Sequence, residues 1–330
     1  MANSTLIDVG CHLDHPAVLA WSRLQPECVE PAGLVQLKGK LKTAVFRLDG
    51  VGPDGSNVIA KRCRTSTARV ERIIYEHLLA RLPLPTLRIY GFVPDGEYCW
   101  LFLEDAGSGR YEPSNETHRA LVAEWLGAIH GASFAAKWTQ MLPRRDASHY
   151  LGLVHQARDE LLAFAGYAAV TADDRTLLNR LAGQCDCIES RWEEAERCFE
   201  DFPPCLVHGD LVIKNLRVSS DARGPALLVF DWEMGGWGVP ATDLAQSVGR
   251  VASPDLKWYC AALQQRVLMQ QVQRLAHFGT LLRVIDKILW ETIDPGGETY
   301  LFFLKPLMTL RRYEPQLAAA LHALDWRHYD

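Results

Sequence analysis

The sequence predicts an α+β protein with two lobes, a small β-rich N-terminal lobe and a larger, mainly helical C-terminal lobe. Three observations lead to this prediction. Short β-branched and apolar runs dominate the first third of the chain, whereas long stretches with helical spacing of apolar residues dominate the rest. A segment rich in Gly, Ser and Pro, residues 107–115, separates the two patterns. A length of 330 residues suits two such lobes, which we place at 1–106 and 107–330.

The N-terminal lobe is expected to consist of strands and one helix. The helix is predicted over 66–82, because apolar residues such as Val70, Ile74 and Leu78 recur at helical spacing and Pro83 ends the pattern. The predicted strands are a hairpin over 33–48 and single strands over 57–61, 87–92 and 98–103.

The C-terminal lobe is expected to be helical except for one β-rich island. The longest periodic stretches, 118–134, 172–198 and 267–291, predict helices. The island spans residues 205–232, where short apolar runs flank polar loops.

Three polar residues lie at the ends of the short apolar runs in this island: Asp210, Asn215 and Asp231. The run 226–230 is entirely apolar and ends at Asp231. A carboxylate at the end of a buried strand needs a partner or a metal ion, because an unpaired buried charge is costly. The three side chains together therefore indicate a functional site.

Phosphoryl transfer requires this set of groups. Mg²⁺ prefers oxygen ligands and keeps several waters, so one carboxylate and one amide suffice beside the phosphates of ATP or GTP. A further carboxylate must orient the acceptor hydroxyl and accept its proton. Asp210 suits this second role, and Asn215 and Asp231 suit the metal.

The motif H-G-D-x-x-x-x-N, from His208 to Asn215, followed by D-W-E at 231–233, resembles the aminoglycoside phosphotransferase and choline kinase family, which is related to protein kinases. The resemblance extends over roughly residues 33–250. It implies a protein-kinase-like fold, with Asp210 as catalytic base, Asn215 and Asp231 as Mg²⁺ ligands, and His208 orienting the catalytic loop. Asp243, in a later segment that resembles the family, is expected to brace that loop.

The N-terminal lobe carries the residues that a nucleotide-binding lobe needs. Lys61 ends a predicted strand and can reach phosphates, if a helical Glu holds it. A rotation of about 100° per residue turns Glu71 toward the apolar face of the helix and Glu76 toward solvent, so Glu71 is the expected partner. The segment from Glu104 to Ala106 resembles the linker whose backbone pairs with the nucleotide base.

Some features of the sequence allow more than one interpretation. The chain has no G-x-G-x-x-G loop, and residues 38–43 would lie over the phosphates instead. Lys214 contacts the transferred phosphoryl group or points to solvent. Glu233 reaches the metal or acceptor, or only braces its loop. Trp237 lines the acceptor pocket or packs elsewhere.

The predicted acceptor is a small hydroxylated molecule: an antibiotic, an amino-alcohol, a sugar or a nucleoside. Helical residues 150–200 and 255–300 are expected to form its pocket. Glu291, Asp294 and Glu298 either meet a cationic acceptor or form a solvated face. Two alternative functions are a nucleotide-binding pseudokinase, which usually lacks a key residue, and a metal-dependent phosphohydrolase, which usually needs more His ligands.

Composition excludes other classes. The net charge of -5 provides no basic stripe for nucleic acid. No apolar run approaches the roughly 20 residues of a membrane span, and the N-terminus does not have the pattern of a secretory signal. The nine cysteines are scattered and odd in number, which is typical of reduced thiols. We expect a cytoplasmic monomer or homodimer.

Overall fold

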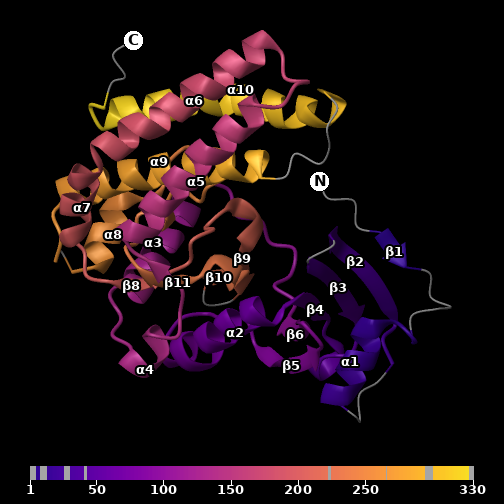
Figure 1. Cartoon of the computed structure of the whole chain (residues 1–330). Coiled ribbons are helices and arrows are strands. Elements are labelled where there is room, and N and C mark those ends of the chain that lie inside the picture. The colour runs from indigo at the N-terminus through magenta and orange to yellow at the C-terminus, as the bar shows by residue number, and fades with distance from the viewer. Residues whose placement is uncertain are drawn as a thin grey trace. The chain divides into compact units, whose positions relative to one another are not determined.

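The computed structural model describes residues 5–7, 13–25, 30–40, 43–221, 224–264, 266–293 and 300–326 (Figure 1). The chain packs into two compact units, and each is discontinuous in sequence, unlike two consecutive lobes. Unit 1 comprises Met1–Tyr111, Phe134–Leu142 and Lys214–Gly235, and unit 2 comprises Glu112–Ser133, Pro143–Ile213 and Gly236–Asp330. The chain first passes between units after Tyr111, inside the predicted linker 107–115.

Unit 1 is built on an antiparallel sheet of six strands in the order β1-β2-β3-β4-β6-β5. Strand β4 pairs with β3 on one side and β6 on the other, so a residue on β4 is held by two neighbours. The strands are β1 (Thr5–Ile7), β2 (Gly33–Lys40), β3 (Thr43–Asp49), β4 (Val58–Arg64), β5 (Ile89–Asp95) and β6 (Tyr98–Glu104).

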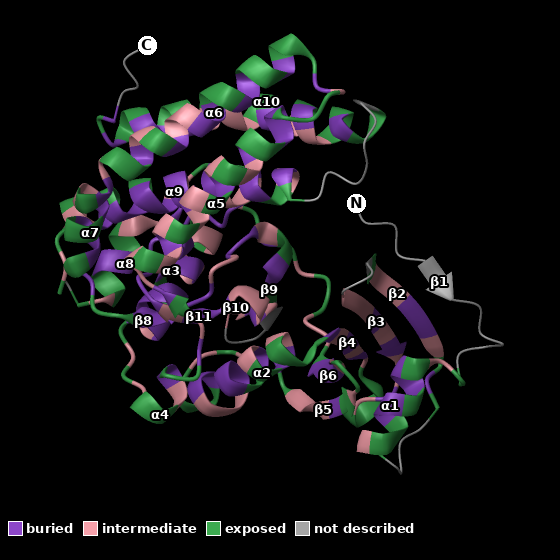
Figure 2. Ribbon diagram, in the orientation of Figure 1, coloured by how far each residue is buried: buried purple, intermediate pink, exposed green. Residues whose placement is uncertain are grey.

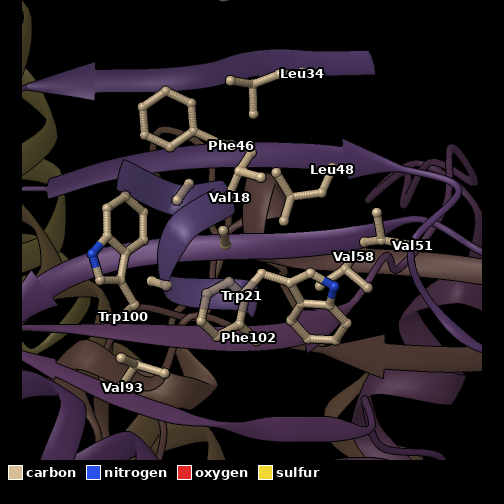
Figure 3. Packing of buried hydrophobic residues seen from close by; sticks show 13 residues of the cluster. Val18, Trp21, Leu34, Phe46, Leu48, Val51, Val58, Val93, Trp100 and Phe102 are labelled. Carbon is tan, nitrogen blue, oxygen red and sulfur yellow. The ribbon is translucent and has the colours of Figure 1, made fainter. Parts of the chain in front are cut away.

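One face of this sheet is covered by helix α1 (Pro16–Leu24), which the sequence analysis did not predict. Figure 3 shows Trp21 of α1 beside Phe102 of β6, and their ring centroids are 5.2 Å apart. Phe46 and Trp100 extend the aromatic cluster, with centroids 6.1 Å apart. These large rings pack in one cluster with residues of β4, and their burial stabilises the position of that strand.

The predicted helix 66–82 is present, but it changes its winding. Helix α2 (Thr65–Ile73) continues as a π-helical turn, Ile74–Leu78, and a 3-10 turn, Leu79–Arg81. The extended Leu82 then precedes Pro83, which disfavours the helical conformation in the residue before it. Unit 1 also contains the hairpin β9 (Leu216–Asp221) and β10 (Gly224–Val229), and the short helix α4 (Ala136–Thr139).

Unit 2 is mainly helical. Thirteen of the 24 residues of helix α9 are buried, most of them apolar, and the helix packs against α5, α8 and α10 (Figure 2). Unit 2 also contains a small sheet in the order β7-β11-β8. Its strand β8 leads into the loop that contains Asp210. The elements are α3 (Glu116–His130), β7 (Arg144–Arg145), α5 (Ala147–Ala165), α6 (Ala172–Ser190), α7 (Trp192–Glu200), β8 (Cys205–Val207), β11 (Gly236–Gly238), α8 (Leu256–Ala262), α9 (Met269–Thr292) and α10 (Tyr300–Ala323).

One predicted helix is interrupted in the structure, and other helices of unit 2 had no predicted range. The stretch 172–198 was expected to be one helix, but Arg191 leaves the helical conformation (φ -115°, ψ 15°) and separates α6 from α7. Helix α10 was not singled out, since it contains Pro306 and Pro315, which weaken any helical prediction. Within the described ranges, no helix combines the length and apolar character that crossing a membrane requires.

Candidate active site

Lys61, on strand β4 of unit 1, lies at the centre of a cluster of carboxylates. Its Nζ donates to Glu71 Oε1 at 2.6 Å and also bonds Asp231 Oδ1, while Glu233 Oε2 lies 3.8 Å away. Lys61 is 6% exposed and Glu71 is fully buried. Glu76 instead bonds Arg72 on the partly exposed side of α2, at 3.0 Å. The rotation of the helix thus turns Glu71, and not Glu76, toward Lys61.

The charges in this cluster stabilise one another. Burial opposes the charge on Lys61, but Glu71, Asp231 and Glu233 outweigh it and hold the pKa of Lys61 well above its ordinary value. Burial also raises the pKa of Glu71, and Lys61 counteracts part of that rise.

Three lysines favour the ionised form of Asp231. Burial acts to raise its pKa, but Lys61 outweighs burial and the pKa is lowered, with smaller contributions from Lys38 and Lys214. Lysines and carboxylates are therefore mixed around Lys61 and Asp231. Such a mixture is suited to phosphate oxygens and a metal ion together. The exposed Lys214 is one of these three lysines.

Asn215 and Asp231 are held next to each other by the β9–β10 hairpin. The amide of Phe230 donates to the carbonyl of Asn215 at 3.1 Å, which brings Asp231 beside Asn215. Asp231 adopts a left-handed conformation (φ 69°, ψ 63°), a costly geometry for a residue with a side chain and one that clusters at functional sites. The carboxylate and the buried amide supply the oxygen donors that Mg²⁺ prefers, so these residues fit the metal.

The other residues that the sequence predicts to bind the nucleotide lie at the end of strand β6. Glu104 is the exposed last residue of this strand, and its carboxylate accepts a hydrogen bond from the amide of Arg88 at 3.0 Å. Ala106 follows, half-buried. Residues 41–42 of the expected phosphate loop lie outside the described residues.

Asp210 belongs to unit 2, on a loop fixed by two buried residues. His208 is fully buried, and its Nδ1 accepts from the Asp210 amide at 3.3 Å. Asp243 accepts from the amides of His208 (2.7 Å) and Gly209 (2.9 Å). Burial acts to raise the pKa of Asp243, but His130 and His208 outweigh burial and lower it. These bonds fix the loop that carries Asp210.

His130 completes this support. It is buried, its Nδ1 lies 3.0 Å from Tyr259 Oη and its Nε2 lies 3.4 Å from Asp243 Oδ2. The side chain therefore serves as a hydrogen-bonded core histidine behind the loop.

Arg283, on helix α9, contacts Asp210 and was not among the predicted site residues. Its Nη2 donates to Asp210 Oδ1 at 2.7 Å, and its Nη1 donates to Gly209 O at 2.9 Å and Asp286 Oδ2 at 3.1 Å. Arg283 is 5% exposed. A signal was present, because an arginine inside the apolar run 281–285 requires a buried partner.

Two further expected residues lie in unit 2. Trp237 is half-buried on β11, and its amide donates to Pro143 O at 2.8 Å. Glu291 is half-buried on α9, and burial raises its pKa. Asp294 and Glu298 lie outside the described residues.

The six-stranded sheet with its Lys–Glu pair, and the helical unit with the loop bearing Asp210, define a protein of the protein-kinase-like class. The chain belongs to the phosphotransferase enzyme family, whose model matches residues 35–286. The family resemblance noted from the motifs is thereby confirmed. No curated protein sequence matches the chain.

Solved structures share the fold at low sequence identity. An aminoglycoside 2'-phosphotransferase in complex with GDP superposes with a TM-score of 0.65 at 10% identity, covering 92% of this chain and 98% of the other. A spectinomycin phosphotransferase with ADP and spectinomycin gives 0.62 at 8% identity (89% and 94% covered). The ethanolamine kinase of Plasmodium vivax gives 0.59 at 14% identity (86% and 81% covered). These similarities confirm the predicted fold class.

Proposed function

We propose that this chain is a kinase that moves the γ-phosphate of ATP or GTP to a hydroxyl group of a small molecule. The observation that carries the proposal is Lys61, buried on β4 and bonded to both Glu71 and Asp231. A lysine fixed between a helical glutamate and a carboxylate at a strand end is positioned to bind phosphate oxygens. The similar structures with GDP or ADP support a nucleotide donor.

Unit 1 would bind the nucleotide and its metal. Lys61 would bind phosphate, held by Glu71, and Lys214 would add charge nearby. Asp231 and Asn215 would hold Mg²⁺. When bound, the ion would neutralise negative charge on the transferred phosphoryl group. The backbone from Glu104 to Ala106 would meet the base.

Unit 2 would supply the acceptor chemistry. Asp210 would orient the acceptor hydroxyl and accept its proton, because a positioned carboxylate can act as general base. Arg283 bonds one oxygen of Asp210 and the adjoining carbonyl of Gly209, so it limits the orientations that this carboxylate can adopt. An oriented base lowers the entropic part of the barrier.

We place the enzyme in the cytoplasm. The seven cysteines in the described part of the chain are all free thiols, as is usual in a reducing compartment. Most of them are buried, which keeps their reactivity low.

The roles can be separated by mutation. We expect Asp210→Asn to slow phosphoryl transfer by about 10²–10⁴-fold while nucleotide still binds, because the amide preserves shape but cannot accept the proton. We expect Asp231→Ala to weaken Mg²⁺-dependent nucleotide binding more than Asn215→Ala, because only the carboxylate neutralises metal charge.

Single-turnover transfer from γ-labelled nucleotide, with acceptors first selected by thermal shift, measures the first effect. Calorimetric titration with and without Mg²⁺ measures the second. Near wild-type transfer by Asp210→Asn would show that Asp210 is not the base. A wild-type chain that binds Mg-nucleotide but neither transfers nor hydrolyses it would be a pseudokinase.

A further inference from the structure

A polar cavity of about 300 Å³ lies within unit 2, between the beginning of helix α3 and the segment 246–253. This volume is at the lower end of the range for small-molecule sites. Among the described residues that line the cavity, Arg119 of α3 is the only charged one. Ser114, Ser247 and Ser253 add hydroxyl groups to the lining. The cavity therefore combines one positive charge with several hydrogen-bond donors.

Arg119 is fixed beside the cavity by a bond that uses only one of its donors. Its Nε donates to the carbonyl of Ser253 at 2.9 Å. The amide of Asp255 donates to the carbonyl of Arg119 at 3.2 Å, which is a second tie between the two segments. In the part of the chain that the structure describes, the two Nη groups of Arg119 bond no protein group. A guanidinium with both Nη groups available can bind a carboxylate or a phosphate through two parallel bonds.

The segment that forms the other side of the cavity has a strained backbone. Ser247 (φ 50°) and Ser253 (φ 53°) both adopt the left-handed conformation, although neither is a glycine. The amide of Ser247 donates to Ser253 Oγ at 2.9 Å, so the two strained residues hold each other. Residues with side chains are unfavourable in this conformation, and such strain concentrates at active sites and ligand-binding segments.

The same segment is bonded to the loop that carries Asp210. The amide of Ile213 donates to the carbonyl of Arg250 at 2.9 Å, and the amide of Ala252 donates to the carbonyl of Leu211 at 3.0 Å. Ile213 is itself part of the cavity lining. A molecule in the cavity would therefore contact the segment that continues from Asp210.

We propose that this cavity binds a small molecule through an anionic group, a carboxylate or a phosphate, and that Arg119 binds this group. The hydroxyl groups of Ser247 and Ser253 can add hydrogen bonds. An anion gains charge-assisted bonds from the guanidinium, whereas a cation would meet repulsion that no carboxylate in the described lining offsets. The site uses none of the residues assigned to phosphoryl transfer, so it goes beyond the proposed function.

Calorimetric titration of the full chain tests the site. The chain is first saturated with Mg²⁺ and a non-hydrolysable triphosphate nucleotide, so that a phosphate probe cannot occupy the nucleotide site. It is then titrated separately with inorganic phosphate and with succinate, which distinguish the two kinds of anionic group. The test variant is Arg119→Gln, which removes the charge but keeps an amide donor. The matched control is Arg197→Gln, at an exposed position of α7 in the same unit.

We expect wild type and Arg197→Gln to bind at least one of the two anions with the same affinity. Arg119→Gln should bind it about tenfold or more weakly, because the charge-assisted bonds are lost. A melting curve verifies that each variant is folded. If Arg119→Gln does not fold, Arg119→Lys takes its place. That variant keeps the charge without the planar fork, and it should bind several-fold more weakly than wild type.

Two results would overturn the proposal: neither anion binds to wild type, or the affinity is unchanged in the folded variant of Arg119. The nucleotide step reports separately on the proposed function. A chain that bound no nucleotide would contradict the proposed function, while the comparison of Arg119→Gln with Arg197→Gln would still reveal whether Arg119 binds an anion.

Discussion

Lys61 and Glu71 form a pair whose members depend on each other. Each removes the cost of burying the other's charge, because Lys61 is almost fully buried and Glu71 is fully buried. Lys61 also contacts Asp231, at a sequence distance of 170 residues. The side chain of Lys61, on strand β4, therefore bonds both helix α2 and the residue that follows β10. Replacing it would remove the contacts among all three elements.

We expect Lys61→Ala and Glu71→Ala each to impair transfer, and the double variant to be little worse than either single one. The reason is that each single change already breaks the same buried pair. Glu76→Ala should have no effect on transfer, since Glu76 contacts the exposed Arg72 and the half-buried His77, and not Lys61.

A double-mutant cycle on transfer rate and nucleotide affinity measures the coupling between Lys61 and Glu71. Additive losses, or a loss in Glu76→Ala equal to that in Glu71→Ala, would contradict the role assigned to this pair.

Helix α9 shows how one element brings distant groups to Asp210. Gly279, Arg283 and Lys287 are spaced by four residues, so they lie along one stripe of the helix. Gly279 allows the close approach, because a Cβ atom there would lie 1.8 Å from Ala241 O, just before Asp243. One turn later Arg283 reaches Asp210, and two turns later Lys287 reaches Val248.

We therefore expect Gly279→Ala to destabilise the protein by about 1–3 kcal/mol, because an overpacked contact with backbone forces the helix away. Transfer should fall as well, since Arg283 would move away from Asp210. Denaturant unfolding gives the free energy of unfolding, and transfer assays give the rate.

Gly152→Ala, on α5, is the matched control. A Cβ atom at Gly152 would contact nothing within 4 Å. That change should stabilise the helix by about 0.5–1 kcal/mol, the ordinary preference for Ala over Gly. Equal effects of the two substitutions would mean that the close approach of Gly279 has no importance.

At the scale of the whole molecule, the segment between Asp231 and Asp243 carries the chain from unit 1 to unit 2. It is short and consists mostly of regular elements: a 3-10 turn at Trp232–Met234, strand β11, and a 3-10 turn beginning at Thr242. Strand β11 pairs with β8 and β7, which fixes its backbone. Thr242 has the only side-chain hydroxyl in the segment and is 8% exposed.

We expect the protein to be active as synthesised, without phosphorylation of its own chain. Protein kinases order a long loop after the metal-binding Asp, often through a phosphate bound to Arg. This segment is too short for such a switch, and its one hydroxyl is buried. Intact-mass spectrometry and transfer assays before and after phosphatase treatment test this. Loss of activity together with a phosphate mass would contradict it.

The sequence alone determined the local chemistry of this protein. The motif from His208 to Asn215 and the apolar strand before Asp231 indicated the candidate catalytic and metal residues. They could be recognised because a strand end and the loop after it are defined by only a few consecutive residues. Helical phase selected Glu71 over Glu76, since rotation per residue is a local property. The roles of these residues remain predictions, whereas the family and the fold class are confirmed.

Only the tertiary structure decided which distant groups meet. The bond from Arg283 to Asp210 joins residues 73 apart, and neither residue's neighbours indicate the other. The interruption at Arg191 was likewise invisible, because apolar spacing continues across it. Local patterns specify which face of an element is buried, but packing determines what that face meets.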